Sequence, residues 1–350
     1  MLGDRLFSKF SKEIGIDLGT SSTLVYVKDK GIVINEPSVV AVNTRTDQIL
    51  AVGDDAKKML GKNPRHIEVI RPLVEGVVSD FEVTEKMLKY FIDKVHQESF
   101  NLIPRPQVVV GIPLDVTEVE RKAVEDAALA AGASKVYLIE EPMAAAVGAR
   151  LPVQESVASF VVDIGGGSAD IAVVSLAGIV TWKSIRVAGD ELNRSIVNYV
   201  RENFNLLLGE KTAENIKIKI GSALPLEEHV EMKVRGRDLI TGLPREITIT
   251  DMQVREALLR SVRMLVENIK IVIESTPPEL VADIYERGIM LTGGGAMLKG
   301  LDKVIARETQ VPVHVADDPL TCVVRGMGII LEDKQLMHDV LVNDTHGQNI

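Results

Sequence analysis

Two short stretches of the chain share one pattern of apolar and polar residues. Residues 14–23 read IGIDLGTSST and lead into the apolar run LVYV, and residues 161–170 read VVDIGGGSAD and lead into IAVV. In each, apolar residues surround an aspartate, glycine and small hydroxyl residues follow, and a second apolar run begins, which is typical of two strands joined by a tight turn. The repetition predicts a duplicated fold of two similar domains, with a cleft between them.

Strand and helix patterns alternate along the rest of the chain. The spacing of Leu88, Phe91, Ile92 and Val95 predicts a helix over about 84–98. Buried strands are expected at 108–113, 135–142, 160–174, 288–294 and 311–315. Further helices are expected at about 190–204, 212–222, 252–276, 296–308 and 319–332. This alternation predicts an α/β fold with mixed sheets.

Local signals place several boundaries. Thr117 and Glu120 form a capping box that opens a helix ending near Gly132. A polar strand pair is expected over 230–250, with turns at Gly236 and Gly242. A long helix then begins after Asp251 and ends before the two prolines at 277–278.

Composition narrows the function classes. The net charge of −10 argues against a general nucleic-acid binder, because the phosphate backbone requires a basic surface. Cys322 is the single cysteine, so an internal disulfide is excluded and a cytosolic location is expected. No apolar run is long enough to span a bilayer and no signal peptide is visible. We therefore expect a soluble protein whose membrane contact, where it exists, is peripheral.

The two repeated turns have the chemistry of an anion site. Gly19 and Gly165–Gly167 allow backbone N–H groups to approach a phosphate, and hydroxyl donors follow at Thr20, Ser21, Ser22, Thr23 and Ser168. Asp17 and Asp163 precede the turns, where a carboxylate can hold Mg²⁺ through water. Two facing turns would bind a polyphosphate. The alternative is an ordinary hairpin turn in each case; neither the P-loop pattern nor the dinucleotide fingerprint is present.

A third glycine cluster, LTGGGAMLKG at 291–300, stands where a strand is expected to meet a helix N-terminus. Backbone of this kind packs against a planar base or binds a phosphate. A tight turn between strand and helix is the alternative interpretation.

The motifs IDLGT, DIGGG and LTGGGA, in this order, resemble those of the actin/Hsp70/sugar-kinase superfamily. Longer stretches resemble the MreB family of bacterial actin-like proteins: DKGIVINEPSVVAV, IRPLVEGVVSDFEV, GASKVYLIEEPMAAAVGA, RGRDLITGLPREITI, TPPELVADIYERGIMLTGGGAMLKGLD and ADDPLTCVVRGMG. The resemblance runs from about residue 14 to 332. It implies a duplicated actin-like ATPase fold, two domains each with a mixed sheet flanked by helices, in four subdomains around an ATP cleft.

The resemblance also implies domain boundaries. Domain I would comprise 13–154 and 324–340, with a small subdomain at about 42–74. Domain II would comprise 155–323, with a small subdomain at about 191–254. Residues 1–12 would be a membrane-binding segment and 341–350 a polar tail.

Site residues follow from the same resemblance. Residues 17–23 and 163–168 would be the phosphate loops, and residues 293–297 with Glu214 and Lys217 would hold the adenosine of ATP, which binds with Mg²⁺. The implied nucleotide-binding residues are Asp17, Gly19, Thr20, Ser21, Ser22, Thr23, Asp163, Gly165, Gly166, Gly167, Gly189, Asp190, Glu214, Lys217, Gly293, Gly294, Gly295, Ala296 and Met297. Without the resemblance to the family, the charges of Glu214 and Lys217 indicate a solvated helix face.

Two residues are candidates for the hydrolytic step of a slow ATPase. Glu141 resembles the acid that positions the attacking water, although a carboxylate at a helix start also stabilises the helix dipole. Ser168 stands where the family usually has threonine, so the hydroxyl is kept and the methyl group that restrains its rotamer is lost. We expect altered turnover rather than its loss.

Two segments are candidate membrane contacts. Drawn as a helix, residues 1–12 place Leu2, Leu6, Phe7 and Phe10 on one side and polar residues on the other, as in an interfacial helix. The loop FNLIPRP at 100–106 carries Leu102 and Ile103, which resemble the exposed apolar membrane loop of the family. The alternative for residues 1–12 is a terminus that is disordered or packs on the domain. The alternative for residues 100–106 is a buried connection between a helix and a strand.

The function that the resemblance implies is that of a self-assembling cytoskeletal protein on the inner face of the cytoplasmic membrane, which organises cell-wall synthesis and maintains cell shape. Its implied partners are further copies in paired antiparallel protofilaments and the membrane proteins MreC, MreD and RodZ. Alternatives are an MreB paralogue, a plasmid-segregating or organelle-positioning filament, a small-molecule kinase and an Hsp70-like chaperone. A kinase would need a sugar-sized pocket and a base, and a chaperone would need a peptide-binding region after the ATPase.

Overall fold

The computed structural model describes residues 13–97 and 105–341, which divide into two compact units. The first unit contains the described residues up to Val157, then Val174–Val180, and the chain from Leu320 onward. The second contains Ala158–Val173 and Thr181–Pro319. None of the helices among the described residues is long and apolar enough to cross a membrane.

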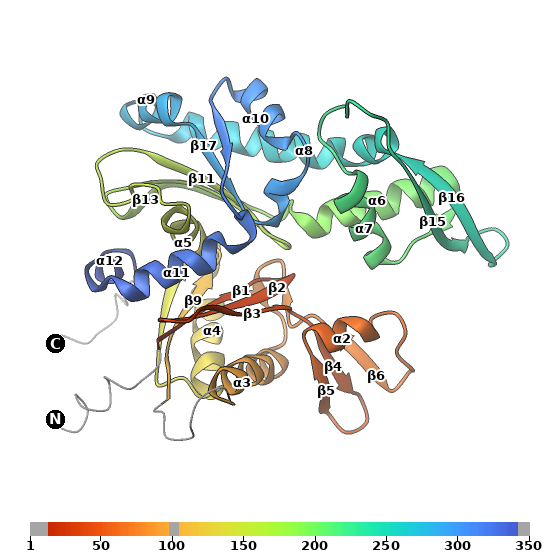
Figure 1. The fold of residues 1–350 in the computed structure, drawn as a ribbon, viewed down its shortest axis with the longest axis horizontal. Helices are drawn as coiled ribbons and strands as arrows, with labels where there is room; N and C mark the ends of the chain where they lie inside the picture. The colour runs from red at the N-terminus through yellow and green to blue at the C-terminus, as the bar shows by residue number, and fades with distance from the viewer. Residues whose placement is uncertain (1–12, 98–104, 342–350) are drawn as a thin grey trace. The chain divides into compact units, whose positions relative to one another are not determined.

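The first unit is built on a five-stranded mixed sheet of order β10-β9-β1-β2-β3. Its strands are β1 (Glu13–Leu18), β2 (Ser22–Val27), β3 (Gly31–Pro37), β9 (Gln107–Ile112) and β10 (Lys135–Glu140). β1 is antiparallel to β2 and parallel to β9, and β10 is parallel to β9. Val108, Val109 and Val110 of β9 are all fully buried, because helices cover both faces of the sheet (Figure 1).

Five helices accompany this sheet: α3 (Phe81–Gln97), α4 (Glu118–Ala130), α5 (Glu141–Gly148), α11 (Cys322–Glu332) and α12 (Lys334–Val340). The predicted apolar face of α3 is confirmed, since Leu88, Phe91, Ile92 and Val95 are all buried in the core of the unit. The Thr117–Glu120 capping box of α4 is confirmed as well.

Smaller elements complete the first unit. They are β4 (Val40–Asn43), β5 (Gln48–Val52), α2 (Asp54–Met59), β6 (Ile67–Ile70), β7 (Leu73–Val74) and β8 (Val77–Val78). β5, β4 and β6 form a three-stranded antiparallel sheet, and α2 packs on it through the buried Ala56.

The second unit repeats the sheet of the first. Its strands are β11 (Ser159–Ile164), β12 (Ala169–Ser175), β13 (Gly178–Ile185), β17 (Ile289–Thr292) and β18 (Val313–Val315), in the order β13-β12-β11-β17-β18. As in the first unit, the first strand lies at the centre, the next two follow on one side, and two later parallel strands lie on the other. The predicted duplication is therefore confirmed by strand order.

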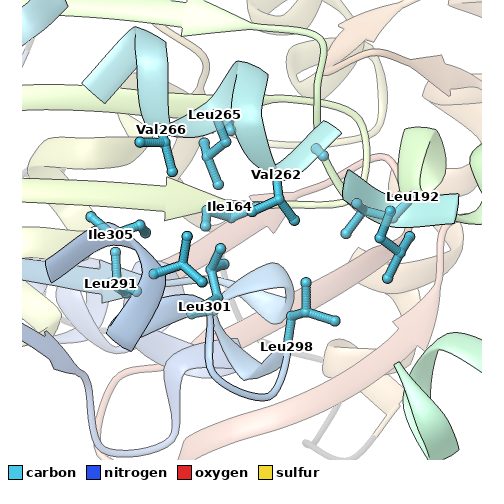
Figure 2. Close-up of a cluster of buried hydrophobic side chains, with 14 of the residues drawn as sticks. Ile164, Leu192, Val262, Leu265, Val266, Leu291, Leu298, Leu301 and Ile305 are labelled. Atoms are coloured by element: carbon cyan, nitrogen blue, oxygen red, sulfur yellow. The ribbon is translucent and has the colours of Figure 1, made fainter. Parts of the chain in front are cut away.

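Helices of the second unit are α6 (Gly189–Phe204), α7 (Glu210–Ile220), α8 (Asp251–Ser275), α9 (Pro278–Arg287) and α10 (Leu301–Thr309). The core lies where α8 and α10 pack on the sheet, and Figure 2 shows Val262, Leu265 and Val266 of α8 converging on Ile164 of β11. Thr250 caps α8 with a second capping box that also involves Gln253.

Of the two turns predicted within residues 230–250, one is confirmed and the other is wrong. β14 (Leu206–Leu207), β15 (Glu231–Asp238) and β16 (Pro244–Thr250) form a small antiparallel sheet. Gly242 lies in the β15–β16 turn with φ of +76°, as predicted. Gly236, however, lies inside β15 opposite Arg245. Glycine is needed there because a Cβ atom would lie 2.4 Å from the carbonyl oxygen of Leu207 on β14.

Two predicted helix starts are also corrected. The segment after the third glycine cluster forms a 3₁₀ turn, η1 (Gly294–Met297), and α10 begins only at Leu301. The break lies at Gly300, whose φ of +73° is left-handed and cannot continue a helix. Near the C-terminus, another 3₁₀ turn, η2 (Pro319–Thr321), precedes α11.

The β15–β16 turn gives a prediction for acid pH. The carboxylate of Asp238 accepts hydrogen bonds from the backbone of Thr241 at 2.8 Å and Ile240 at 2.9 Å, and from the guanidinium of Arg245 at 2.9 Å. These bonds, that from Thr241 first, lower the pKa of Asp238 to about 2. Because the pKa is depressed in the folded state, the stabilisation is present above the unfolded value of about 3.9 and is lost as pH falls towards 2.

We therefore expect Asp238→Asn to be less stable than the unsubstituted protein at pH 7 and to approach it at pH 3. Urea unfolding midpoints of both proteins at the two pH values check this. A difference that stays the same size at pH 3 would contradict the assignment.

Candidate nucleotide site

In the first unit, the turn between β1 and β2 is held by neighbouring loops. Asp17 lies near the end of β1 opposite Leu24. The hydroxyl of Ser38 donates to the carbonyl of Gly19 at 2.6 Å, and the backbone N–H of Gly76 donates to the hydroxyl of Thr20 at 2.8 Å. The turn is therefore a pre-organised backbone loop rather than a free hairpin end.

The predicted hydroxyl donors of this turn differ in exposure. Ser21 is exposed and Ser22 is half-buried, so both are accessible to a ligand. Thr20 is 5% exposed, and Thr23 is fully buried and shares a hydrogen bond of 2.8 Å with Ser38. A direct contact of Thr23 with phosphate would therefore require its hydroxyl to leave this partner.

Glu141 lies at the same edge of the sheet as this turn. β1, β9 and β10 are parallel, so their carboxyl ends meet at one edge, and ligands of α/β sheets bind outside such ends. Glu141 follows β10 as the first residue of α5, is 9% exposed, and lies against Gly111 of β9. Pro142 in the first turn fixes the start of this helix.

In the second unit, Asp163 lies at the corresponding edge of the sheet. The hydroxyl of Thr292, its parallel neighbour on β17, donates to its carboxylate at 2.7 Å. Burial, together with the nearby charge of Asp170, raises the pKa of Asp163 to about 7 despite this bond. A buried carboxylate with a raised pKa favours a nearby cation, because a cation offsets the desolvation of the charged form.

Glycine backbone and one lysine surround the turn that follows Asp163. The turn closes through the N–H of Gly165, which donates to the carbonyl of Ser168 at 2.9 Å. The N–H groups of Gly189 and Asp190, at the start of α6, donate to the carbonyls of Gly165 at 3.1 Å and Gly166 at 2.8 Å. The structure therefore brings the glycine-rich turn after Asp163 and the start of α6 into direct contact.

Lys217 joins α7 to this cluster. Its ammonium donates to the carbonyl of Gly189 at 2.8 Å, and a Cβ atom on Gly189 would lie only 3.4 Å from the lysine nitrogen. Burial lowers the pKa of Lys217, while the charges of Asp190 and Glu214 act in the opposite direction. Glu214, one turn earlier on α7, is half-buried.

The third glycine cluster reaches the same edge of the second sheet. Gly293 has a φ of +77°, and a Cβ atom there would lie 2.4 Å from the carbonyl of Ile164 and 2.9 Å from the carboxylate of Asp163. Gly295 is equally close to the side chain of Ile164. In η1, Ala296 is buried, whereas Met297 is 59% exposed.

The contacts above join seven of the predicted residues into one cluster at the carboxyl ends of the parallel strands of the second unit: Asp163, Gly165, Gly166, Gly189, Asp190, Lys217 and Gly293. It contains glycine backbone, a buried carboxylate and a partly buried ammonium, groups that suit the phosphates and the associated cation of a nucleotide. Among residues 13–97 and 105–341, no group of three or more His, Cys, Asp or Glu side chains could hold a metal ion by itself.

Two residues of this cluster were not among the predicted site residues. Thr292 precedes the third glycine cluster and positions Asp163, and its place between an apolar strand and GGG was the available signal. Asp170, only 1% exposed, lies near enough to raise the pKa of Asp163. Its polar position inside an otherwise apolar strand was the signal there.

The candidate membrane contacts lie outside the described residues. They are Leu2, Leu6, Phe7, Phe10, Leu102 and Ile103. Both remain predictions from the sequence.

Known proteins of one family are similar to this chain over almost its whole length. The family model described as MreB/Mbl protein matches residues 11–339. Cell shape-determining protein MreB of Escherichia coli (strain K12) is 52% identical over 329 residues, which cover 92% of this chain and 94% of that protein. Cell shape-determining protein Mbl of Bacillus subtilis (strain 168) is 49% identical over 324 residues, covering 93% and 97%.

Solved structures agree with the fold. MreB5 of Spiroplasma citri bound to ADP is 35% identical with a TM-score of 0.89, over 94% of this chain and 98% of that one. The same protein bound to AMPPNP is 36% identical, with the same TM-score and coverage. A MamK double helical filament, at 21% identity and a TM-score of 0.77 over 92% of this chain and 99% of that one, shows the shared fold alone. The predicted actin-like fold is confirmed.

Proposed function

Because this chain belongs to the MreB/Mbl family, we propose that it is an actin-like cytoskeletal protein that binds ATP and assembles with copies of itself into filaments. The filaments would lie on the inner face of the cytoplasmic membrane, organise cell-wall synthesis and maintain cell shape. Their partners would be MreC, MreD and RodZ. The cell-shape names of the relatives and the nucleotides bound to MreB5 support this proposal.

One observation carries the nucleotide part of the proposal. The contacts of Asp163 with Thr292, of Gly165 and Gly166 with the start of α6, and of Lys217 with Gly189 bring four separate segments to one sheet edge. Close packing on Ile164 explains glycine at 293 and 295, but it does not explain why a buried carboxylate and a partly buried ammonium lie beside them. A phosphate-binding role accounts for both.

We propose a role for each group of residues in this site. Backbone around Gly165–Gly167 would bind phosphate oxygens, Asp163 would hold Mg²⁺ through water, and η1 with Glu214 and Lys217 would hold the adenosine. In the first unit, the Asp17–Thr23 turn would bind phosphate and Glu141 would orient a water molecule. Mg²⁺ would neutralise charge on the phosphates, and the protein's contribution would be positioning.

Filament assembly would depend on nucleotide through linkage. ATP favours an assembly-competent state only by the difference between its affinities for that state and for others. A single N-terminal segment would bind lipid weakly, whereas many copies along one filament would bind well.

Electron microscopy of the purified protein on a lipid monolayer, with Mg-ATP and without nucleotide, tests the proposal. We expect filaments lying flat on lipid with Mg-ATP, and their loss from lipid in a variant with Leu2, Leu6, Phe7 and Phe10 changed to serine. Filaments that stay on lipid in the variant would assign the contact to Leu102 and Ile103. Absence of filaments under every condition would overturn the cytoskeletal proposal.

A smaller prediction concerns hydrolysis. Ser168 lies directly before β12 and is 6% exposed. Unlike threonine, serine has no methyl group on Cβ to restrain the rotamer of its hydroxyl. We expect Ser168→Thr to change the rate of phosphate release about two- to tenfold without changing nucleotide affinity, since the hydroxyl is kept and a rotamer preference is worth roughly 0.5–1.5 kcal/mol. A phosphate-release assay measures this, and an unchanged rate would contradict the assigned role.

A further inference from the structure

The β11–β12 hairpin of the second unit differs from the β1–β2 hairpin of the first at one buried position. In the first unit, Asp17 of β1 is paired with Leu24 of β2, and the side chain of Leu24 is buried. The same offset along the chain leads from Asp17 to Asp163 and from Leu24 to Asp170. The duplicated hairpin therefore has a second carboxylate where the first hairpin has an apolar side chain.

The turn of the second hairpin sets the register that brings these two carboxylates together. The N–H of Gly165 donates to the carbonyl of Ser168 at 2.9 Å, so these two residues face each other across the neighbouring strands β11 and β12. Two residues further from the turn on each strand, Asp163 lies opposite Asp170. Directly opposed residues of an antiparallel pair have Cβ atoms about 4.5–5.5 Å apart on the same face of the sheet.

Both carboxylates are enclosed by the second unit. Asp163 is 5% exposed and Asp170 is 1% exposed. Like charges directly opposite each other destabilise a sheet, and burial strengthens the repulsion because little water is left to screen it. Burial first, and the charge of Asp170 in addition, raise the pKa of Asp163. Burial combined with a neighbouring like charge is typical of functional sites, so the packing of the hairpin does not account for Asp170.

The groups named in the cluster around this turn bring more negative than positive charge. Lys217 brings an ammonium, which donates to the carbonyl of Gly189 at 2.8 Å. The carboxylates come from Asp163, Asp170 and Asp190. A nucleotide without a metal ion would bring its full phosphate charge next to these carboxylates. A nucleotide that carries a divalent cation brings less net negative charge, and the cation itself is attracted by the carboxylates.

We propose that Asp170 is a specificity-determining residue, which excludes metal-free nucleotide and so makes nucleotide binding conditional on a divalent cation. This inference rests on the proposed function, because it concerns the same site. Asp170 acts through its charge beside Asp163 and does not need to touch the phosphates. A divalent cation compensates the carboxylate pair, and the glycine backbone of the turn then binds the phosphates. The site thereby selects the nucleotide together with the cation that neutralises its phosphates.

The affinity of the full-length protein for a fluorescent ATP analogue, measured with Mg²⁺ and with EDTA, tests the proposal. Titrations at pH 8 lie above the pKa of Asp163, which is about 7. Asp170→Asn removes the charge and keeps the size of the side chain. We expect its affinity for the metal-free analogue to rise about tenfold or more, since a like charge within about 4–6 Å has effects of this order. Its affinity in the presence of Mg²⁺ should change less than about threefold, because the cation already compensates the charge that is removed.

Three further variants separate charge from packing. Asp170→Glu keeps the charge and should keep the requirement for Mg²⁺, whereas Asp170→Leu reproduces the pairing of the first unit and should relax it as Asp170→Asn does. Glu202→Gln removes the same charge from an exposed position of α6 and should change neither affinity. Structural damage would lower the affinities with and without Mg²⁺ together, so a rise in the metal-free affinity alone identifies the charge. Circular dichroism of the nucleotide-free proteins checks folding, and Asp170→Leu replaces Asp170→Asn where the latter does not fold.

Two results would overturn this inference and leave the nucleotide site in place. In the first, a folded Asp170→Asn protein keeps the ratio of the two affinities that the unsubstituted protein has. In the second, Asp170→Glu binds the metal-free analogue as tightly as Asp170→Asn does, so that charge is not the cause. A different result, an unsubstituted protein that binds no analogue even with Mg²⁺, would overturn the proposed nucleotide function and this inference with it.

Discussion

Asp163→Asn is expected to abolish Mg-ATP-dependent filament formation without unfolding the nucleotide-free protein. The asparagine side chain can still accept the hydrogen bond from Thr292, which the carboxylate now accepts at 2.7 Å, so the packing of β11 against β17 is kept. What is removed is a negative charge in a site that is 5% exposed. We expect nucleotide affinity in the presence of Mg²⁺ to fall about 100-fold, since truncating a buried charged contact costs roughly 2–5 kcal/mol.

Nucleotide titration with a fluorescent ATP analogue and sedimentation of polymer measure the two effects. Thr292→Val is the matched control: it removes the hydrogen bond but leaves the carboxylate, so it should weaken binding less than Asp163→Asn does. Unchanged affinity in Asp163→Asn, with the protein still folded, would exclude Asp163 from the metal-nucleotide site.

Gly326→Ala is expected to destabilise the first unit by about 3 kcal/mol or more, because it forces apart two helices whose backbones touch. A Cβ atom on Gly326 of α11 would lie 1.8 Å from the carbonyl oxygen of Ala144 on α5. On the other side of the crossing, a Cβ atom on Gly148 would lie 1.9 Å from the carbonyl oxygen of Cys322. Both obstacles are backbone atoms, so a side-chain rotation cannot relieve the overlap.

Thermal unfolding followed by circular dichroism checks this prediction. Gly209→Ala is the control, since no atom lies within 4 Å of the added methyl group and the φ of −76° is accessible to alanine. A Gly326→Ala protein as stable as this control would show that α5 and α11 can separate at little cost. Because α5 begins with Glu141, such a shift would also change the position of the proposed water-orienting carboxylate.

Sequence patterns located the regular elements well where the local signal is strong. The apolar face of α3 and the capping box of α4 follow from spacing and side-chain chemistry within a few residues, so they could be read without the fold. The predictions were wrong where a glycine is compatible with two different local structures. Gly236 was predicted in a turn, but it lies inside β15 because the backbone of Leu207 passes close to it. Gly300 interrupts what was predicted as one helix from 296 to 308.

The residues of the candidate site also divide into those that the sequence predicted and those that it did not. Glycine, hydroxyl and acidic residues at strand ends marked Asp163, Gly165 and Gly293 from the sequence. Thr292 and Asp170 were missed as site residues because their importance lies in what they do to Asp163, 129 residues away in the chain in the case of Thr292. A hydrogen bond across two parallel strands depends on register, and register is set by pairing of distant segments.

By itself, the sequence determined the α/β class, the duplication and the positions of the two glycine-containing turns after Asp17 and Asp163, because these depend on local periodicity and on residue chemistry repeated in each half. Only the tertiary structure decided that Thr23 is fully buried, that Lys217 reaches the carbonyl of Gly189, and that α8 leaves Leu259 and Arg263 uncovered. These properties arise when segments distant in the sequence pack together, because burial and contact depend on which surfaces meet in the folded chain.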